Sequence, residues 1–331
     1  MRQKIICAKK YYQRKSVKIY LHIGTEKTGT STIQEFLFQN RENLMRQGYY
    51  YLHMEGRTEY RDLPAYCMNM DRVDRYFKIN FIDSKEKRLE FNNRFIIDFH
   101  QKMKNLPDHI HTLIISSEHF SSRLRFPDEL EKLKQLLRDY TEDITVICYL
   151  RNQADKLLSQ YSTRVKTGAS IKIENFYKNF ISSNKNNYES KLDLWGGVFG
   201  KNNLEVKIFD KKEFHNNSLL DDFIQIIDKN LLTELNMEIS QKNESLSKNG
   251  IYFARLVNRI IPAFNHKKGS SKMNRILLDL ITRFIKGKPL VLSNSQYNEL
   301  TGYFASSNEK VRSRYFPQRK SLFNNETSEK V

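Results

Sequence analysis

The residues best suited to chemistry lie in one short segment, which reads GTEKTGTST from Gly24 to Thr32. Its glycines let the backbone approach a ligand closely, and its hydroxyl side chains donate hydrogen bonds. A helix that begins just after such a loop adds partial positive charge, so the combination binds anions such as phosphate. We therefore predict an anion site at Lys27, Thr28, Gly29, Thr30, Ser31 and Thr32.

The nearest general pattern is the nucleotide-triphosphate loop G-x-x-x-x-G-K-[ST]. Gly24 and Gly29 have its spacing, but Thr30 stands where the lysine belongs, and Lys27 lies inside the loop instead. Without that lysine the contact to the β- and γ-phosphates is lost, which disfavours an ATPase or kinase. Two alternatives stay open: a divergent P-loop nucleotide kinase that needs ATP and magnesium, and a ligand-free Gly/Thr-rich turn capped by Ser31.

The elements that must position this loop alternate between strand and helix. Apolar runs predict four buried strands, and periodic apolar residues predict helices between them. This alternation predicts an α/β fold with a parallel sheet, which binds ligands at the carboxyl ends of its strands. The strands are expected at 18–24, 112–120, 144–151 and 204–209, and the helices at 31–46, 129–140, 152–168 and 219–228.

The loop resembles the 5′-phosphosulfate-binding loop of sulfotransferases, which use 3′-phosphoadenosine 5′-phosphosulfate as sulfuryl donor. The similarity lies in HIGTEKTGTSTIQ (22–34), where the lysine precedes Thr-Gly-Thr. The resemblance implies that Lys27 contacts the bridging oxygen of the phosphosulfate and stabilises the leaving group. Residues 28–32 would then cradle the 5′-phosphate, so positioning and charge stabilisation would carry most of the catalysis.

Sulfotransferases bind the donor's 3′-phosphate with an arginine at a strand end and a serine about two helical turns later. Arg151 ends the strand at 144–151, and Ser159 follows within the helix at 152–168. Taken alone, the pair also fits an arginine that caps its strand and a solvent-facing serine. Weaker similarity at 195–210, 243–247 and 314–323 extends the resemblance over most of residues 18–323, which look most like bacterial carbohydrate sulfotransferases.

A general base assists sulfuryl transfer to a hydroxyl, and in this family it is usually His or Glu. Glu118 and His119 end the strand at 112–120, where neighbouring side chains point to opposite faces unless the strand has already ended. Related bacterial enzymes often carry a histidine near 59–66, where this chain has Arg61 and Asp62. Asp62 could replace the base and Arg61 could bind an acidic sugar. We expect Glu118 to be the base, ahead of His119 and Asp62.

Residues 18–323 are expected to form one α/β domain with a P-loop-like parallel sheet flanked by helices. Its part at 251–323 reads as mostly helical and basic, a basic segment (1–17) precedes the domain, and a tail (324–331) follows. The net charge is +18, with seven Lys/Arg and no acid in residues 1–18, and fifteen Lys/Arg against five acids in residues 251–331. These ends are either solvated tails or contacts for an anionic partner.

The resemblance implies 3′-phosphoadenosine 5′-phosphosulfate as donor co-substrate and a glycan or glycolipid acceptor. Neither a metal nor a nucleic acid is expected, because no His/Cys/Asp cluster has ligand spacing and the aromatic residues fit apolar stripes better than stacking surfaces. A basic nucleic-acid-binding protein remains the alternative outside enzymes. No run approaches the ~18–20 apolar residues of a membrane span, and no signal peptide is visible, which indicates a cytoplasmic protein.

The helix expected at 275–288 has two interpretations. Its apolar stripe either packs on the core or docks on an anionic membrane surface, where a lipid-linked acceptor would be found. The flanking basic residues suit both. The stripe comprises Ile276, Leu277, Leu280, Ile281 and Phe284, with Arg275, Arg283, Lys286 and Lys288 beside it.

Overall fold

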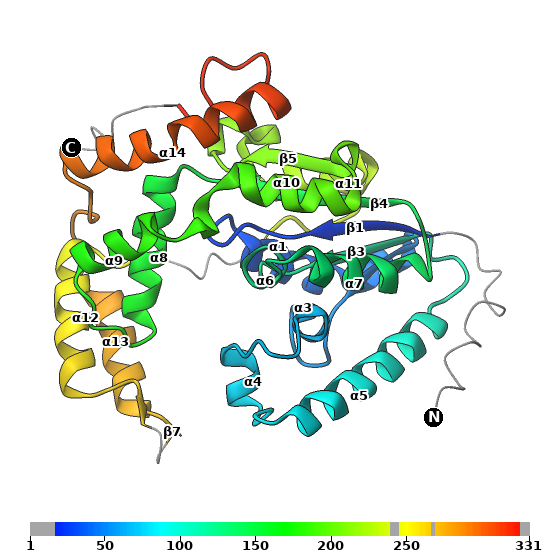
Figure 1. Cartoon of the computed structure of the whole chain (residues 1–331), viewed down its shortest axis with the longest axis horizontal. Coiled ribbons are helices and arrows are strands. Elements are labelled where there is room, and N and C mark those ends of the chain that lie inside the picture. The colour runs from blue at the N-terminus through cyan, green and yellow to red at the C-terminus, as the bar shows by residue number, and fades with distance from the viewer. Residues whose placement is uncertain (1–16, 239–244, 266–268, 325–331) are drawn as a thin grey trace. The chain divides into compact units, whose positions relative to one another are not determined.

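The computed structural model describes residues 17–238, 245–265 and 269–324 (Figure 1). The chain divides into two compact units, one of residues 1–150 with 191–239 and the other of residues 151–190 with 240–331. Most of the basic segment at 1–17, the tail after Asn324 and part of the segment at 243–247 lie outside the described residues. None of the helices within the described ranges is long and apolar enough to cross a membrane.

The first unit contains a five-stranded parallel sheet, which confirms the predicted α/β fold. Its strand order is β2-β3-β1-β4-β5, so the strand before the Gly24 loop lies at the centre. Every residue of β3 is buried and all but one of β4, as expected for strands covered on both faces. The strands are β1 (Lys18–His22), β2 (Tyr49–Leu52), β3 (Thr112–Ser116), β4 (Ile144–Leu150) and β5 (Leu204–Ile208).

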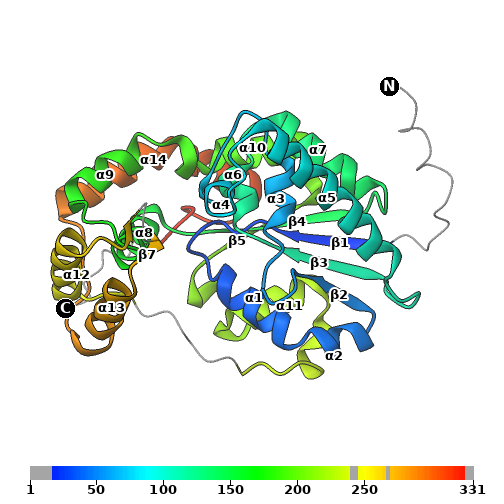
Figure 2. The same ribbon diagram turned by 90° about the horizontal axis from the view of Figure 1, so that it is seen from below.

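Two layers of helices cover this sheet (Figure 2). On one face lie α1 (Thr30–Gln39), α2 (Arg41–Arg46) and α11 (Leu219–Ile227). Phe36 of α1 and Phe223 of α11 are fully buried there against Tyr20 and Tyr149 of the sheet. On the other face lie α3 (Asp62–Cys67), α5 (Lys85–Lys104), α6 (His119–Arg123) and α7 (Pro127–Arg138). A shorter helix of this unit is α4 (Arg75–Ile79). Helix α10 (Tyr188–Phe199) belongs to this unit from Lys191 onward.

The structure corrects two predicted elements. The helix expected at 31–46 is two helices, because the Asn40 side chain donates hydrogen bonds to Phe36 O (3.1 Å) and Asn236 O (2.9 Å) at the break. Asparagine competes with the backbone in this way and favours helix ends. The strand expected at 112–120 ends at Ser116, and α6 starts at His119. Glu118 and His119 therefore lie beyond the strand, where strict alternation of faces no longer applies.

The second unit is helical, as predicted for the C-terminal part. Its helices are α8 (Gln153–Lys166), α9 (Ile173–Ile181), α12 (Lys248–Ile260), α13 (Lys272–Phe284) and α14 (Asn294–Tyr315), with a short hairpin of β6 (Phe264–Asn265) and β7 (Gly269–Ser270). The helices expected at 152–168 and in 251–286 are thus confirmed. One apolar core joins α8, α12 and α13, and another joins α8, α9 and α14.

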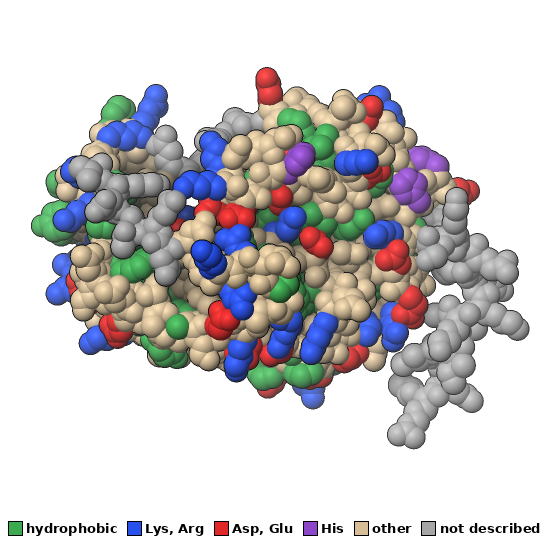
Figure 3. Space-filling model, turned by 90° about the horizontal axis from the view of Figure 1, so that it is seen from above, with side chains coloured by type: hydrophobic (Ala, Val, Ile, Leu, Met, Phe, Trp, Pro, Cys, Tyr) green, Lys and Arg blue, Asp and Glu red, His purple; other side chains and the backbone are tan. Residues whose placement is uncertain are grey.

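Charged side chains of both signs are interspersed on the face drawn in Figure 3. Lys and Arg lie among Asp and Glu there, so the charge visible on this face is not gathered into one basic patch.

Candidate functional site

The Gly24 loop leaves the carboxyl end of β1 and leads into α1. Hydrogen bonds to β4 fix its start: Tyr149 N donates to Gly24 O (2.6 Å), and Thr25 donates to Tyr149 O through both its amide and its hydroxyl (3.1 Å each). Since β1 and β4 are neighbours in the sheet, these bonds extend their pairing into the loop. The loop therefore sits at the carboxyl edge of the sheet, as predicted for a ligand site.

The backbone of the loop is held in uncommon conformations. Gly24, Lys27 and Gly29 have φ values of +93°, +71° and +73°. For Lys27, which has a Cβ, such a value is rare and persists only where the surroundings impose it. Hydrogen bonds inside the loop do so, since Thr28 Oγ1 and Thr30 Oγ1 donate to Thr25 O at 2.6 and 3.5 Å.

Helix α1 begins without a side-chain cap. Its N-cap is Gly29, so the cap expected at Ser31 in the alternative of a Gly/Thr-rich turn is wrong. Thr32 N and Ile33 N donate to Gly29 O, and the other amides of the first turn have no acceptor within the helix. Ser31 is exposed. An uncapped helix start with an exposed hydroxyl beside it suits an anion.

Glu118 lies against the first glycine of the loop. A Cβ added to Gly24 would stand 3.1 Å from Glu118 Cβ, a tight contact, and the φ of +93° at this position also disfavours a side chain. The amide of the buried Gln34, on α1, donates to Glu118 Oε2 (3.3 Å) and to Ser116 O (3.2 Å). Burial, and then the negative charges of Glu59 and Glu26, raise the pKa of the Glu118 carboxyl. A carboxylate with a raised pKa is a better proton acceptor than an ordinary one.

His119 lies next to Glu118 in a different environment. Its Nε2 is 3.9 Å from Glu59 Oε1, and its buried Nδ1 has no hydrogen-bond partner among the described residues. Burial, and then the positive charges of Arg61 and Arg123, lower the His119 pKa to about 3. The imidazole is therefore neutral at pH 7 and a weak base, whereas Glu118 is the stronger candidate.

Arg61 and Asp62 belong to a network of charged and aromatic groups rather than to an open surface. Arg61 is 4% exposed and forms an ion pair with Asp74, and its guanidinium lies 4.8 Å from the centre of the Tyr76 ring. Asp62 accepts a hydrogen bond from the Tyr76 hydroxyl. Both predicted residues thus have protein partners at the start of α4.

The same network reaches the loop through Arg123, which the sequence analysis missed. Arg123 Nε donates to Asp74 Oδ2 (3.1 Å), and its Nη1 is 3.8 Å from Glu26 Oε1 in the loop. The first unit thus brings the loop, Glu118, His119 and the Arg61 network to one region. Gln34, Glu59 and Arg123 are its unpredicted members. Only Gln34 carried a signal in the sequence, because it lies one turn after the hydroxyl run on a helix predicted to follow the loop.

Arg151 and Ser159 belong to the second unit, whereas the loop belongs to the first unit. Arg151 follows the last residue of β4, and the Tyr188 hydroxyl donates to Arg151 O (2.6 Å). Burial lowers the Arg151 pKa, with Asp155 and Tyr188 opposing this change. Ser159 is half-buried on α8, and its carbonyl accepts a bond from Thr163 Oγ1 (3.0 Å).

His22 is a core residue. It is fully buried in β1, and its Nδ1 is 2.8 Å from Ser116 Oγ. Burial lowers the His22 pKa to about 3, so it carries no charge at neutral pH. No group of three or more His, Cys, Asp or Glu within the described ranges is arranged to hold a metal ion.

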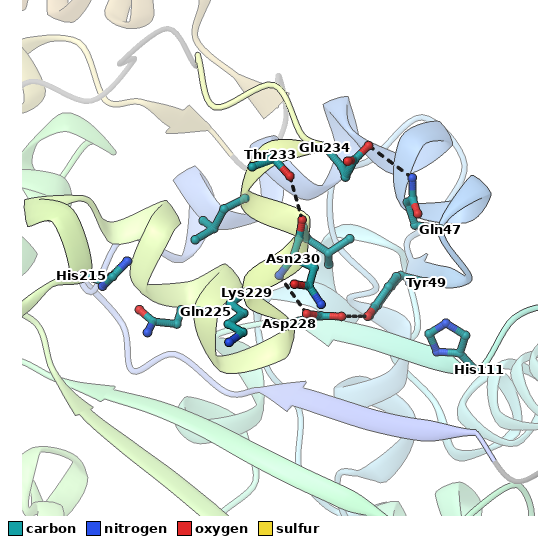
Figure 4. Close-up of a pocket in the computed structure, with 12 residues that line it drawn as sticks. Gln47, Tyr49, His111, His215, Gln225, Asp228, Lys229, Asn230, Thr233 and Glu234 are labelled. Atoms are coloured by element: carbon teal, nitrogen blue, oxygen red, sulfur yellow. Dashed lines mark hydrogen bonds between the residues drawn. The ribbon is translucent and has the colours of Figure 1, made fainter.

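A cavity of about 720 Å³ opens at a different part of the first unit (Figure 4). It lies beside Tyr49, the first residue of β2, and His111, the residue before β3, hence at the amino ends of these strands. Tyr49 points to Asp228 and donates to its Oδ2 (2.6 Å). None of the predicted site residues lines this cavity, so it is separate from the loop site.

Comparison with known proteins does not assign the chain to a family. No protein-family model matches it. An uncharacterized protein of Archaeoglobus fulgidus is 27% identical over 204 residues, which are 62% of this chain and 54% of that protein. The chain thus spans about half the length of this curated relative. The crystal structure of a sulfotransferase from Alicyclobacillus acidocaldarius aligns with a TM-score of 0.46 and 12% identity, over 91% of this chain and 96% of that one.

Proposed function

We propose that this chain is a sulfotransferase that transfers a sulfuryl group from 3′-phosphoadenosine 5′-phosphosulfate to a hydroxyl of a carbohydrate, such as a bacterial surface glycan or its glycolipid precursor. One observation carries the proposal. The loop at the carboxyl edge of the central strand combines Lys27 with an uncapped helix start, and the half-buried side chain of Glu118 lies against its Gly24. An anion cradle beside a proton acceptor is what transfer to a hydroxyl requires.

In the proposed reaction, the acceptor hydroxyl oxygen attacks the donor's sulfur in line with the bond to the bridging oxygen. As the new S–O bond forms, the old one breaks, its electron pair stays on the bridging oxygen, and adenosine 3′,5′-bisphosphate leaves. Lys27 stabilises the charge that develops on this oxygen, while residues 28–32 hold the 5′-phosphate. Glu118 takes the hydroxyl proton, and Gln34 keeps its carboxylate directed by the 3.3 Å hydrogen bond.

The acceptor is proposed to carry an acidic group, which Arg61 would bind. Arg61 Nη1 is buried and has no hydrogen-bond partner within the described part of the chain, which supports this assignment. Asp62 would contribute indirectly, because its bond to the Tyr76 hydroxyl holds the ring under the Arg61 guanidinium. Arg61 would therefore add selectivity for acidic sugars among hydroxyl acceptors.

Thermal unfolding with three ligands tests this function against its rivals. Adenosine 3′,5′-bisphosphate should raise the melting temperature, because a ligand that binds only the folded state stabilises it by about 2.7 kcal/mol at a hundredfold excess over its dissociation constant. ATP with magnesium and a DNA oligomer should raise it far less. A larger shift with ATP and magnesium would favour the nucleotide kinase, and a larger shift with DNA would favour the nucleic-acid-binding protein.

Replacing Arg151 should weaken donor binding, because Arg151 is proposed to hold the donor's 3′-phosphate. A charge-assisted hydrogen bond contributes roughly 1.5–3 kcal/mol and a neutral one about 1 kcal/mol, so Arg151→Ala should cost more affinity than Ser159→Ala. Calorimetry should find that the wild type prefers adenosine 3′,5′-bisphosphate over adenosine 5′-monophosphate and that Arg151→Ala loses most of this preference.

The exposed Arg164 on α8 offers the matched control. Arg164→Ala removes the same charge from the same unit and should keep the preference of the wild type. Equal wild-type affinities for the bisphosphate and the monophosphate would refute the assignment of a 3′-phosphate site to Arg151 and Ser159.

A further inference from the structure

Helix α13 presents a row of large apolar side chains to solvent. Their spacing of three or four residues places them on one side of the helix. A different side carries Leu278 and Ile281, which are buried in the core shared with α8 and α12. The exposed apolar row consists of Met273, Ile276, Leu280 and Phe284, at 57%, 52%, 46% and 69% exposure.

The apolar stripe predicted at 275–288 is partly buried and partly exposed. The stripe is divided: Ile281 packs in the core and Leu277 is half-buried, whereas Ile276, Leu280 and Phe284 remain at the surface. Packing and surface contact therefore use different side chains of α13. The helix is anchored in its unit by one face and leaves a second apolar face available, which a helix that only packs on a core does not need.

Basic residues accompany the exposed apolar row. Residues 248–288 contain ten Lys and Arg but one acid, Asp279. Lys272 and Arg283 immediately precede Met273 and Phe284, and the Arg283 guanidinium lies 5.6 Å from the centre of the Phe284 ring. Helices that lie on membranes share this design, because apolar side chains enter the boundary of the acyl chains while Lys and Arg contact anionic headgroups.

We propose that α13 docks peripherally on an anionic phospholipid surface through its exposed apolar row. The basic surroundings select this occupant, since they would attract negatively charged lipid and add nothing to contact with a neutral surface. The proposal does not depend on the sulfotransferase function. If both hold, docking would keep the enzyme where lipid-linked glycans are found.

Co-sedimentation with vesicles tests the proposal on the full chain. At low salt the protein should sediment with phosphatidylcholine vesicles that contain phosphatidylglycerol and much less with phosphatidylcholine alone. The double variant Leu280→Ser with Phe284→Ser should bind about tenfold more weakly, because it removes the inserted apolar groups. Lys272→Glu and Arg283→Glu should each weaken binding about fivefold or more, and moderate salt should do the same.

Helix α5 of the first unit offers matched controls, because Ile97 is 64% exposed and Lys104 is exposed at its end. Ile97→Ser and Lys104→Glu should bind vesicles like the wild type, and circular dichroism should find all variants folded. No sedimentation with anionic vesicles at low salt would overturn the proposal, as would unchanged binding of the double variant. A concentration-dependent dimer in sedimentation velocity that the double variant abolishes would also overturn it and assign the row to a second copy of the chain.

Discussion

Lys27→Ala should lower the turnover of sulfuryl transfer by about 10² to 10³, because one electrostatic contact to the developing charge typically contributes that much. The loop that carries Lys27 is fixed by bonds of Thr25, Thr28 and Tyr149 that do not use this side chain. The fold should therefore survive, with a melting temperature close to that of the wild type. Release of adenosine 3′,5′-bisphosphate measures the turnover.

Lys27→Arg is the control for charge alone, and it should recover part of the lost turnover. If Lys27→Ala keeps more than about a third of the wild-type turnover, the loop does not stabilise the leaving group and the assignment of Lys27 is wrong.

Glu118→Gln should lower turnover by about 10² to 10⁴ while leaving donor affinity nearly unchanged. Glutamine keeps the shape of the side chain at its close approach to Gly24 but cannot accept the proton. Because the pKa of Glu118 is raised, wild-type activity should already decline on acidification at a higher pH than for an ordinary glutamate, as the carboxylate becomes protonated. The variant should lack this acidic limb in its pH–rate profile.

His119→Ala and Asp62→Asn are the comparisons for the base. Both should reduce turnover less than Glu118→Gln, since His119 has a pKa of about 3 and Asp62 is bonded to Tyr76. If one of them shows the large loss of turnover with intact donor binding, that residue is the base and Glu118 is not.

The predictable strands bury continuous apolar runs, and the predictable helices carry periodic apolar residues. Strands β1, β4 and β5 and helices α7, α8 and α11 lie close to their expected positions. Strand β2 was missed because it is only four residues long, although its three tyrosines are typical of strands. Helix α5 was also missed, although Phe91, Phe95 and Phe99 repeat every four residues along its buried side.

The loop was the part of the candidate site most readily predicted, because its residues are neighbours in the chain. The hydroxyl run and Lys27 form one segment, and the anion loop follows from it. Arg123 contacts Asp74, 49 residues away in the chain, and Glu26, 97 residues away. No local sequence pattern predicts such contacts. Whether Glu118 or His119 has the stronger proton affinity also depended on burial and on charges from other elements, which spacing does not reveal.

Transfer of labelled sulfate to an acceptor would demonstrate the proposed reaction itself. Donor carrying sulfur-35 in its sulfuryl group is incubated with the full chain and a panel of neutral and acidic glycans and lipid-linked glycans, and the label on each acceptor is counted. We expect label on at least one acceptor, more on acidic than on neutral acceptors, and about a hundredfold less label with Lys27→Ala. Label on no acceptor, from a protein that adenosine 3′,5′-bisphosphate does not stabilise, or equal labelling by wild type and Lys27→Ala, would contradict the proposed reaction.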